Sequence, residues 1–294
     1  MSSLAMRLLA AGLRRTRKRP VESVDGARRR LNAPKDDPAP PLWFTRKHRV
    51  TRRTVDGFDS YTVLPAQGEP SRSVLYVHGG SYVSEISPWH WVMVAHIVDE
   101  GFRVEVPIYG LAPEHTHREV FGFLVAVYRD LLAYTSPERT VFAGDSAGAG
   151  LALALTQDLP AHGLPRPARL LLISPWVDLT LSHPDIPRIE VRDPWLSPVW
   201  LREAARAWAG GDDPALPSLS PINGPLEDLP PVDLYIGTAD VFHPDTRRLN
   251  DLIALAGGTP DLYEEEGAIH VFPLVPSPEG RRARAHILRT LRTV

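Results

Sequence analysis

Short apolar segments alternate with helix-length segments over most of the chain from residue 49 onward. The pattern opens with two segments, 49–55 and 58–64, on either side of Asp56-Gly57, a dipeptide typical of two-residue β-hairpin turns. Further strands are predicted at 74–77, 103–107, 141–143, 170–173, 232–236 and 262–263. Helices are predicted at 89–99, 118–133, 147–159, 245–256 and 279–291. Continuously apolar strands separated by helices indicate an α/β fold with a mostly parallel sheet covered on both faces.

Two stretches lie outside this alternation. Residues 1–48 precede the sheet, and 183–217 interrupt it with three tryptophans and several prolines. Leucines in the first stretch recur at i,i+4 spacing, which predicts a short amphipathic helix capped by Ser2 or Ser3. We therefore expect a basic helical segment over 1–48 and a main domain over 49–294 that contains the insertion 183–217.

Charge is distributed unevenly along the chain. The formal net charge is only −2, which gives no case for a nucleic-acid partner, yet 1–53 carry 15 Lys and Arg against 4 Asp and Glu. We interpret this basic arm as a solvated or internally paired segment, with contact to a membrane surface as the alternative. If the arm is internally paired, we expect it to dock on the acidic main domain near the entrance of the site and to bury Leu4, Leu8 and Trp43.

Composition also limits the location and the chemistry. The N-terminus has no positive residue ahead of its apolar part, so we expect a cytoplasmic protein and not a secreted one. No apolar stretch approaches the roughly 20 residues that a membrane-spanning helix needs. Cysteine is absent, which excludes disulfides and a thiolate nucleophile. The histidines have no metal-ligand spacing such as H-E-x-x-H, so no metal site is expected.

A glycine-flanked serine follows the predicted strand 141–143. The segment Gly144-Asp145-Ser146-Ala147-Gly148 matches G-x-S-x-G, in which a tight strand-to-helix turn exposes the serine hydroxyl. The turn also leaves the next backbone N–H free near a helix N-terminus, where negative charge is favoured. Ser146 is therefore the predicted nucleophile, and a serine that merely caps the helix is the alternative.

A second group of small residues follows the predicted strand 74–77. In His78-Gly79-Gly80-Ser81 the small residues let the main chain approach a substrate and direct its amides at one oxygen. We expect an oxyanion hole from the N–H groups of Gly80 and Ser81, with Gly79 as a further candidate, joined by Ala147. His78 is interpreted as a hydrogen-bonding residue that holds the loop, because a base must reach the nucleophile.

Taken in order, these motifs resemble the hormone-sensitive-lipase-like branch of the α/β-hydrolase superfamily, with its H-G-G-G loop and G-D-S-A-G turn. The resemblance runs from about residue 55 to the C-terminus and includes 109–115, 174–180, 229–231 and 237–240. It implies an eight-stranded sheet, hydrolysis of carboxylic esters without a cofactor, and short or medium acyl chains. It also implies a helical cap over the site, to which the segment 1–48 and the insertion 183–217 contribute.

Three positions depart from the family pattern. Ser81 stands where the family has the last glycine of the loop, and Gly110 stands where it usually has arginine. Val271 follows the presumed catalytic histidine in place of glycine. None of the three removes a reacting group, but the first could tilt an oxyanion donor and the third could narrow the acyl pocket.

The acid and the base are expected in the chain order Ser, Asp, His. Asp240 follows the strand 232–236 and His270 lies on a loop after 262–263, so both fall at the carboxyl ends of strands. His270 is predicted to take the serine proton while Asp240 orients the imidazole and stabilises its charged form. Three other residues compete for these roles but have simpler interpretations. Asp245 is expected to begin a helix, His243 to be a loop residue and Asp178 to form a turn.

Aromatic residues lie near the oxyanion loop and in the insertion 183–217. Trp89, Trp195 and Val271 are predicted to line the substrate pocket, whereas the alternative for the tryptophans is packing of the cap against the body. The sequence therefore predicts a serine carboxylesterase for a small-molecule ester. Two alternatives stay open, which are amide or peptide hydrolysis by the same triad and a non-catalytic small-molecule receptor. The oligomeric state has no signal.

Overall fold

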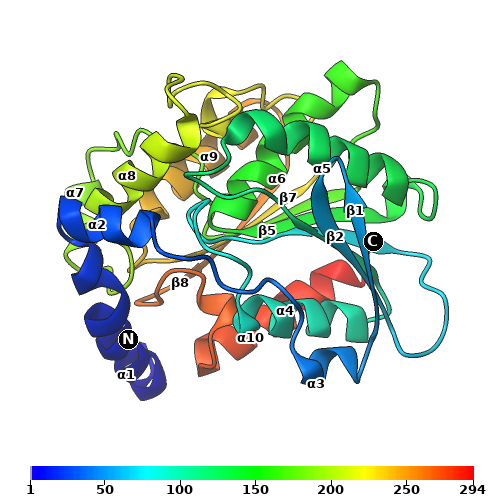
Figure 1. Cartoon of the computed structure of the whole chain (residues 1–294), viewed down its shortest axis with the longest axis horizontal. Coiled ribbons are helices and arrows are strands. Elements are labelled where there is room, and N and C mark those ends of the chain that lie inside the picture. The colour runs from blue at the N-terminus through cyan, green and yellow to red at the C-terminus, as the bar shows by residue number, and fades with distance from the viewer. Residues whose placement is uncertain (1) are drawn as a thin grey trace.

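An eight-stranded sheet forms the centre of the computed structural model, which describes residues 2–294 (Figure 1). The order across the sheet is β1-β2-β4-β3-β5-β6-β7-β8, with β2 antiparallel to both neighbours and all other pairs parallel. The α/β prediction is thereby confirmed. The strands are β1 (Arg49–Val55), β2 (Phe58–Leu64), β3 (Ser73–Val77), β4 (Arg103–Ile108), β5 (Thr140–Asp145), β6 (Arg169–Ile173), β7 (Val232–Gly237) and β8 (Pro260–Glu265).

The hairpin β1–β2 has the predicted boundaries. Asp56 and Gly57 have φ angles of 46° and 86°, the positive values that a type I′ turn requires at both central positions. Val55 pairs with Phe58 across the turn, so only two residues separate the strands. Two residues of local sequence thus set the register of the first strand pair.

Helices cover both faces of the sheet, as Figure 1 shows. Side chains of β3 alternate, because Leu75 and Val77 join one hydrophobic cluster whereas Val74 and Tyr76 join the other. Helical side chains of the first cluster come from α5 (His117–Leu131), α6 (Ala147–Asp158) and α9 (His243–Leu255) and also from the insertion 183–217, and those of the second come mainly from α4 (Pro88–Asp99) and α10 (Pro278–Leu291). The central strands β3, β5 and β7 therefore end within a two-sided core that holds their loops in place.

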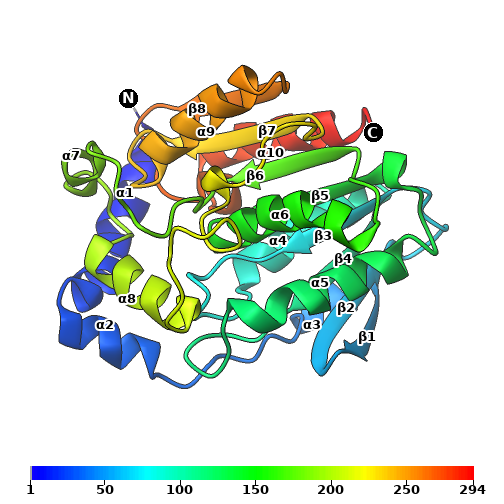
Figure 2. The same ribbon diagram turned by 90° about the horizontal axis from the view of Figure 1, so that it is seen from above.

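The segments 1–48 and 183–217 form further helices outside these layers. Helix α2 (Val24–Leu31) packs on α8 (Pro198–Ala209), and Figure 2 shows the two side by side, with α1 (Leu4–Leu13) near them. The remaining α-helices of the two segments are α3 (Leu42–Thr45) and α7 (Ile186–Glu190). Within residues 2–294, no helix combines the length and apolar character needed to cross a bilayer.

Helix α1 begins as predicted but buries a different stripe. The Ser3 hydroxyl caps it by accepting a hydrogen bond from the Met6 N–H at 3.1 Å. Met6 and Leu13 pack on a cluster around Phe272, whereas Leu4 and Leu8 are 63% and 66% exposed. The expectation that Leu4, Leu8 and Trp43 are buried is therefore wrong, since Trp43 is also exposed. Because α1 is apolar around most of its circumference, leucine spacing alone does not select the packed face.

Candidate active site

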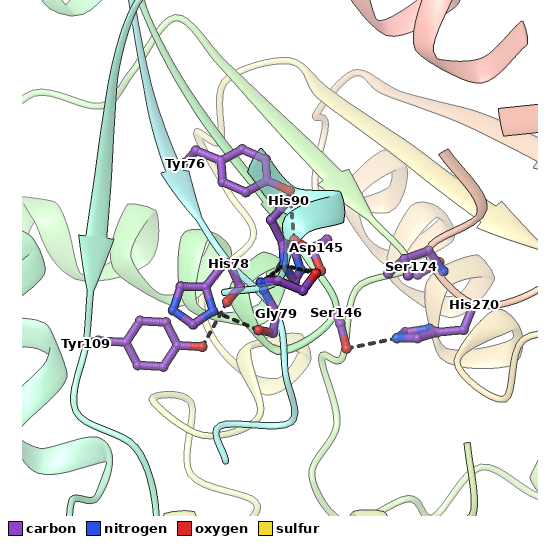
Figure 3. Close-up of polar contacts among 11 residues, drawn as sticks. Tyr76, His78, Gly79, His90, Tyr109, Asp145, Ser146, Ser174 and His270 are labelled. Atoms are coloured by element: carbon purple, nitrogen blue, oxygen red, sulfur yellow. Dashed lines mark hydrogen bonds and ion pairs between the residues drawn. The ribbon is translucent and has the colours of Figure 1, made fainter. Parts of the chain in front are cut away.

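Three side chains from separate loops meet in a linear arrangement. The Ser146 Oγ lies 3.0 Å from His270 Nε2, a contact that Figure 3 shows, and His270 Nδ1 lies 2.9 Å from Asp240 Oδ2. All three residues are buried. Because an ionised carboxylate only accepts hydrogen bonds, it holds the proton on Nδ1 and leaves Nε2 free to accept from the serine hydroxyl.

The turn at Ser146 is tight, and glycine is required on both sides. Ser146 has a φ of 52°, a left-handed conformation that β-carbon-bearing residues rarely adopt. A Cβ on Gly144 would lie 2.6 Å from the Gly148 oxygen, and one on Gly148 would lie 2.1 Å from the Val77 oxygen. The two glycines thus let β5 and β3 approach the turn closely, which holds the hydroxyl beyond the strand ends.

Asp240 is fixed by hydrogen bonds on its own loop and by a second buried carboxylate. The Phe242 N–H donates to Asp240 Oδ1 at 3.0 Å. Asp193 Oδ2 accepts from the Val241 N–H at 2.8 Å, and Asp193 Oδ1 accepts from the Trp195 N–H at 2.7 Å. Asp193 was not predicted as a site residue, because Asp193-Pro194 is an ordinary turn signal in the sequence. Burial and the nearby charge of Asp240 together raise the pKa of Asp193 to about 6.

The charge environment favours protonation of His270. Burial by itself would lower the pKa of the imidazole, but the adjacent Asp240 carboxylate more than offsets this through its charge and its hydrogen bond. Asp193 adds to the same effect, so the pKa of His270 is raised above its ordinary value of 6.5. The site therefore stabilises an imidazolium, the form that a histidine takes after it accepts a proton.

None of the competing residues hydrogen-bonds to His270. Asp178 Oδ1 accepts from the Thr180 N–H at 2.8 Å, which is the predicted turn role. Asp245 is in the first turn of α9, as expected. His243 contacts Glu264 at 2.5 Å. Of these candidate acids, only Asp240 contacts the imidazole.

The oxyanion loop presents free amides beside Ser146. Within residues 2–294, the N–H groups of Gly80, Ser81 and Ala147 donate no hydrogen bond to the protein. The Gly79 N–H instead donates to Asp145 Oδ1 at 3.2 Å, so its inclusion among the oxyanion donors is corrected. A local motif names the glycines of such a loop but not the direction of each amide, which depends on the carboxylate from β5.

Ser81 tolerates the glycine position at a conformational cost. Its φ is 57°, so the left-handed backbone is kept with a Cβ present. Its hydroxyl accepts a hydrogen bond from Trp200 Nε1 at 3.2 Å, and Trp200 lies on α8. The departure from the family pattern therefore links the oxyanion loop to the insertion 183–217.

A buried network around Asp145 holds the loop in place (Figure 3). Its carboxylate accepts from the Tyr76 hydroxyl at 2.8 Å and from His90 Nε2 at 3.0 Å, in addition to Gly79. The Ser87 N–H donates to His90 Nδ1, which leaves the ring proton on Nε2. Although burial by itself would raise it, the pKa of Asp145 is lowered because His90 and Tyr76 stabilise the anion.

His78 holds the loop as predicted. Its Nδ1 donates to the Gly79 oxygen at 2.8 Å, its ring stacks on Tyr109 at 4.6 Å, and the Tyr109 hydroxyl donates to the His78 oxygen. Burial is the main cause that lowers its pKa to about 4, so the ring is neutral. Figure 3 shows the ring on the opposite side of the loop from the Ser146–His270 contact.

A cavity of about 770 Å³ opens onto Ser146 and His270. Trp89, Trp195 and Val271 line this cavity, and these are the three residues that the sequence predicts for the substrate pocket. Trp89 meets Trp195 edge-to-face with ring centroids 5.7 Å apart, and Trp195 meets His270 in the same way. Among the other tryptophans, Trp200 also lines the cavity, whereas Trp91 and Trp208 are buried in the hydrophobic clusters. Most of the remaining lining comes from two segments, 80–90, which holds the oxyanion loop, and 16–36, which has no predicted site residue.

Comparison with known proteins agrees with this geometry. Residues 74–274 match the family model described as the alpha/beta hydrolase fold. The chain belongs to the α/β-hydrolase family. This hydrolase is 38% identical to an acetyl-hydrolase of Streptomyces hygroscopicus over 78% of each chain, and 31% identical to an esterase of Mycobacterium tuberculosis over 76% of this chain and 78% of that one. A solved esterase of the bacterial hormone-sensitive lipase family superposes with a TM-score of 0.83, at 30% identity over 100% of this chain and 99% of that one. The predicted family resemblance is confirmed.

Proposed function

We propose that this α/β-hydrolase is a serine carboxylesterase that cleaves short- to medium-chain esters of small molecules through an acyl-enzyme. The arrangement of Ser146, His270 and Asp240, joined by contacts of 3.0 and 2.9 Å, is the observation that carries the proposal. The names of its relatives, an acetyl-hydrolase and an esterase, support the same class of reaction.

In the proposed mechanism the Ser146 oxygen attacks the ester carbonyl while His270 Nε2 accepts its proton. The N–H groups of Gly80, Ser81 and Ala147 stabilise the negative charge that develops on the carbonyl oxygen. His270 then returns the proton to the departing alcohol, which leaves an acyl group on Ser146. Water attacks this acyl-enzyme by the same sequence of proton transfers and releases the acid.

We also propose that 1–48 and 183–217 together form a cap on the main domain 49–294. Three observations support this division. Helix α2 packs on α8, and both segments contribute residues to the cavity wall. The buried Lys18 ammonium donates hydrogen bonds to the backbone carbonyl oxygens of Glu190 and Asp193. The N-terminal segment is thus attached to the insertion at two places.

Labelling with a fluorophosphonate, combined with kinetics on p-nitrophenyl acetate and p-nitroacetanilide, tests the function. We expect labelling at Ser146, hydrolysis of the ester well above that of the anilide, and loss of both labelling and turnover in Ser146→Ala. Asp240→Asn should lower kcat by about 10⁴, because the wrong imidazole tautomer faces the serine. Near-normal turnover in Asp240→Asn would refute the assignment of the acid. Faster anilide cleavage would favour an amidase, and tight binding without turnover would favour a receptor.

A further inference from the structure

The cavity that leads to Ser146 is lined at one part by three arginines of the N-terminal segment, Arg17, Arg29 and Arg30. None of them forms a salt bridge with an acidic residue in the part of the chain that the structure describes, 2–294. Other arginines, such as Arg169 and Arg292, pair with a carboxylate of the chain. Guanidinium groups left without a carboxylate in the wall of a cavity are suited to an anion from outside the chain.

Arg30 connects this basic wall to the oxyanion loop. Its Nη2 donates to the Ser84 hydroxyl at 2.8 Å, and the Ser84 N–H donates to the Gly80 oxygen at 2.9 Å. Two hydrogen bonds therefore separate this guanidinium from a proposed oxyanion donor. Burial and the nearby charge of Arg17 lower the pKa of Arg30, so cationic groups gather here without full compensation.

Three acidic residues share the cavity wall with these arginines, namely Asp36, Glu85 and Asp145. Asp36 is exposed, and its charge acts on Arg30. Glu85 is half-buried, one of its carboxylate oxygens lacks a hydrogen-bond partner among the described residues, and burial raises its pKa to about 7. Asp145, which also reaches the cavity, is already bonded to His90. Arg17 and Arg29 are exposed and Arg30 is half-buried, so the three guanidinium groups lie on a solvent-accessible part of the wall, where an anion that enters the cavity can meet them.

We propose that the preferred esters carry an anionic group, a carboxylate or a phosphate, which Arg17, Arg29 and Arg30 bind while the scissile carbonyl lies at Gly80 and Ala147. The inference rests on the proposed esterase function and adds a substrate class to it. The aromatic wall of Trp89 and Trp195 would receive the uncharged part of such a molecule. A cavity of about 770 Å³ has room for a small ester with a charged end.

Two matched ester pairs test the proposal and show which side of the scissile bond carries the charge. Mono-p-nitrophenyl succinate is compared with p-nitrophenyl butyrate for an anion on the acyl side. Acetoxybenzoate is compared with its methyl ester for an anion on the alcohol side. We expect kcat/KM for at least one anionic ester to exceed that of its neutral partner by about tenfold, as one charge-assisted contact allows. This preference should decrease as ionic strength rises from 20 to about 500 mM.

Arginine variants connect the preference to this wall. In the double variant Arg17→Gln/Arg30→Gln, the anionic-to-neutral ratio of kcat/KM should fall by about 10- to 100-fold, mainly through KM. Arg15→Gln is the matched control, because Arg15 is exposed in the same turn and does not line the cavity. Its ratio should equal that of the wild type. If the double variant does not fold, Arg29→Gln removes an exposed guanidinium that donates no hydrogen bond within residues 2–294 and should lower the ratio several-fold.

The inference is overturned if neutral esters are preferred in both pairs, or if the ratio is the same in the wild type and the arginine variants. Failure of the esterase proposal has a different signature, in which neither ester pair is hydrolysed and fluorophosphonate does not label Ser146. In that case calorimetry with acetoxybenzoate and its methyl ester decides the inference by binding alone. Weaker binding of the anion to the arginine variants would support it, and equal binding would refute it.

Discussion

Lys18 is the residue through which the N-terminal segment should contribute most to stability. It ends a π-helical turn, Arg14–Lys18, and only 4% of it is exposed. Its ammonium donates to the backbone carbonyl oxygen of Glu190 at 2.6 Å and to that of Asp193 at 2.8 Å. Replacement by methionine keeps most of the apolar stem but removes both donors. The change therefore tests the attachment of the segment with little loss of packing.

The expected magnitude follows from these two contacts. Each carbonyl left without its partner costs about 1–3 kcal/mol, and the relief of burying an ammonium offsets part of the sum. We expect Lys18→Met to lower the free energy of unfolding by about 2–4 kcal/mol, and the melting temperature by about 3–7 °C. Because the side chain of Asp193 holds the Val241 N–H next to Asp240, kcat should also fall several-fold.

Calorimetry, limited proteolysis and ester kinetics on one preparation provide the measurement. Arg15→Met is the control, since Arg15 is exposed in the same turn and should change the melting temperature by less than about 2 °C. Earlier cleavage within 1–48 in Lys18→Met would show that the segment detaches first. A melting temperature equal to that of the control would refute the reasoning and assign the attachment to apolar contacts such as those of Met6 and Leu13.

Two further predictions concern the site. His270 must be neutral to accept a proton, and its pKa is raised. The value of kcat/KM for a p-nitrophenyl ester should therefore rise with pH through a midpoint above 6.5. A midpoint below 6.5 would contradict the proposed coupling of His270 to Asp240. Ser81→Gly relieves a left-handed backbone strain but removes the acceptor of Trp200 Nε1, so stability should change by no more than about 1 kcal/mol and kcat by about threefold or less. A loss of about 10²–10³ in kcat would instead show that the hydroxyl itself acts on the substrate.

Local sequence determined the strands, the hairpin and the turn at Ser146. Apolar runs of strand length are recognisable where both faces of a strand are covered, and Asp56-Gly57 favours a two-residue turn through its local backbone preference. The chain order of Ser146, Asp240 and His270 could be predicted for a related reason. Ser146 and Asp240 follow apolar strands that the sequence shows clearly, whereas the strand before His270 has only the two-residue signal 262–263, although β8 covers Pro260–Glu265. Parallel strands bring their carboxyl ends to one edge of the sheet.

Tertiary structure decided which surfaces and amides these elements use. Periodicity shows that α1 is apolar, but only the cluster around Phe272 selects Met6 and Leu13 over Leu4 and Leu8. The direction of the Gly79 N–H likewise depends on a carboxylate 66 residues away, a contact without a local signal. The position of Asp193 beside the Asp240 loop, and that of the arginines in the cavity wall, also have no local signal in the sequence. Such placements arise from the burial of whole elements against each other, which is a property of the complete chain and not of any segment within it.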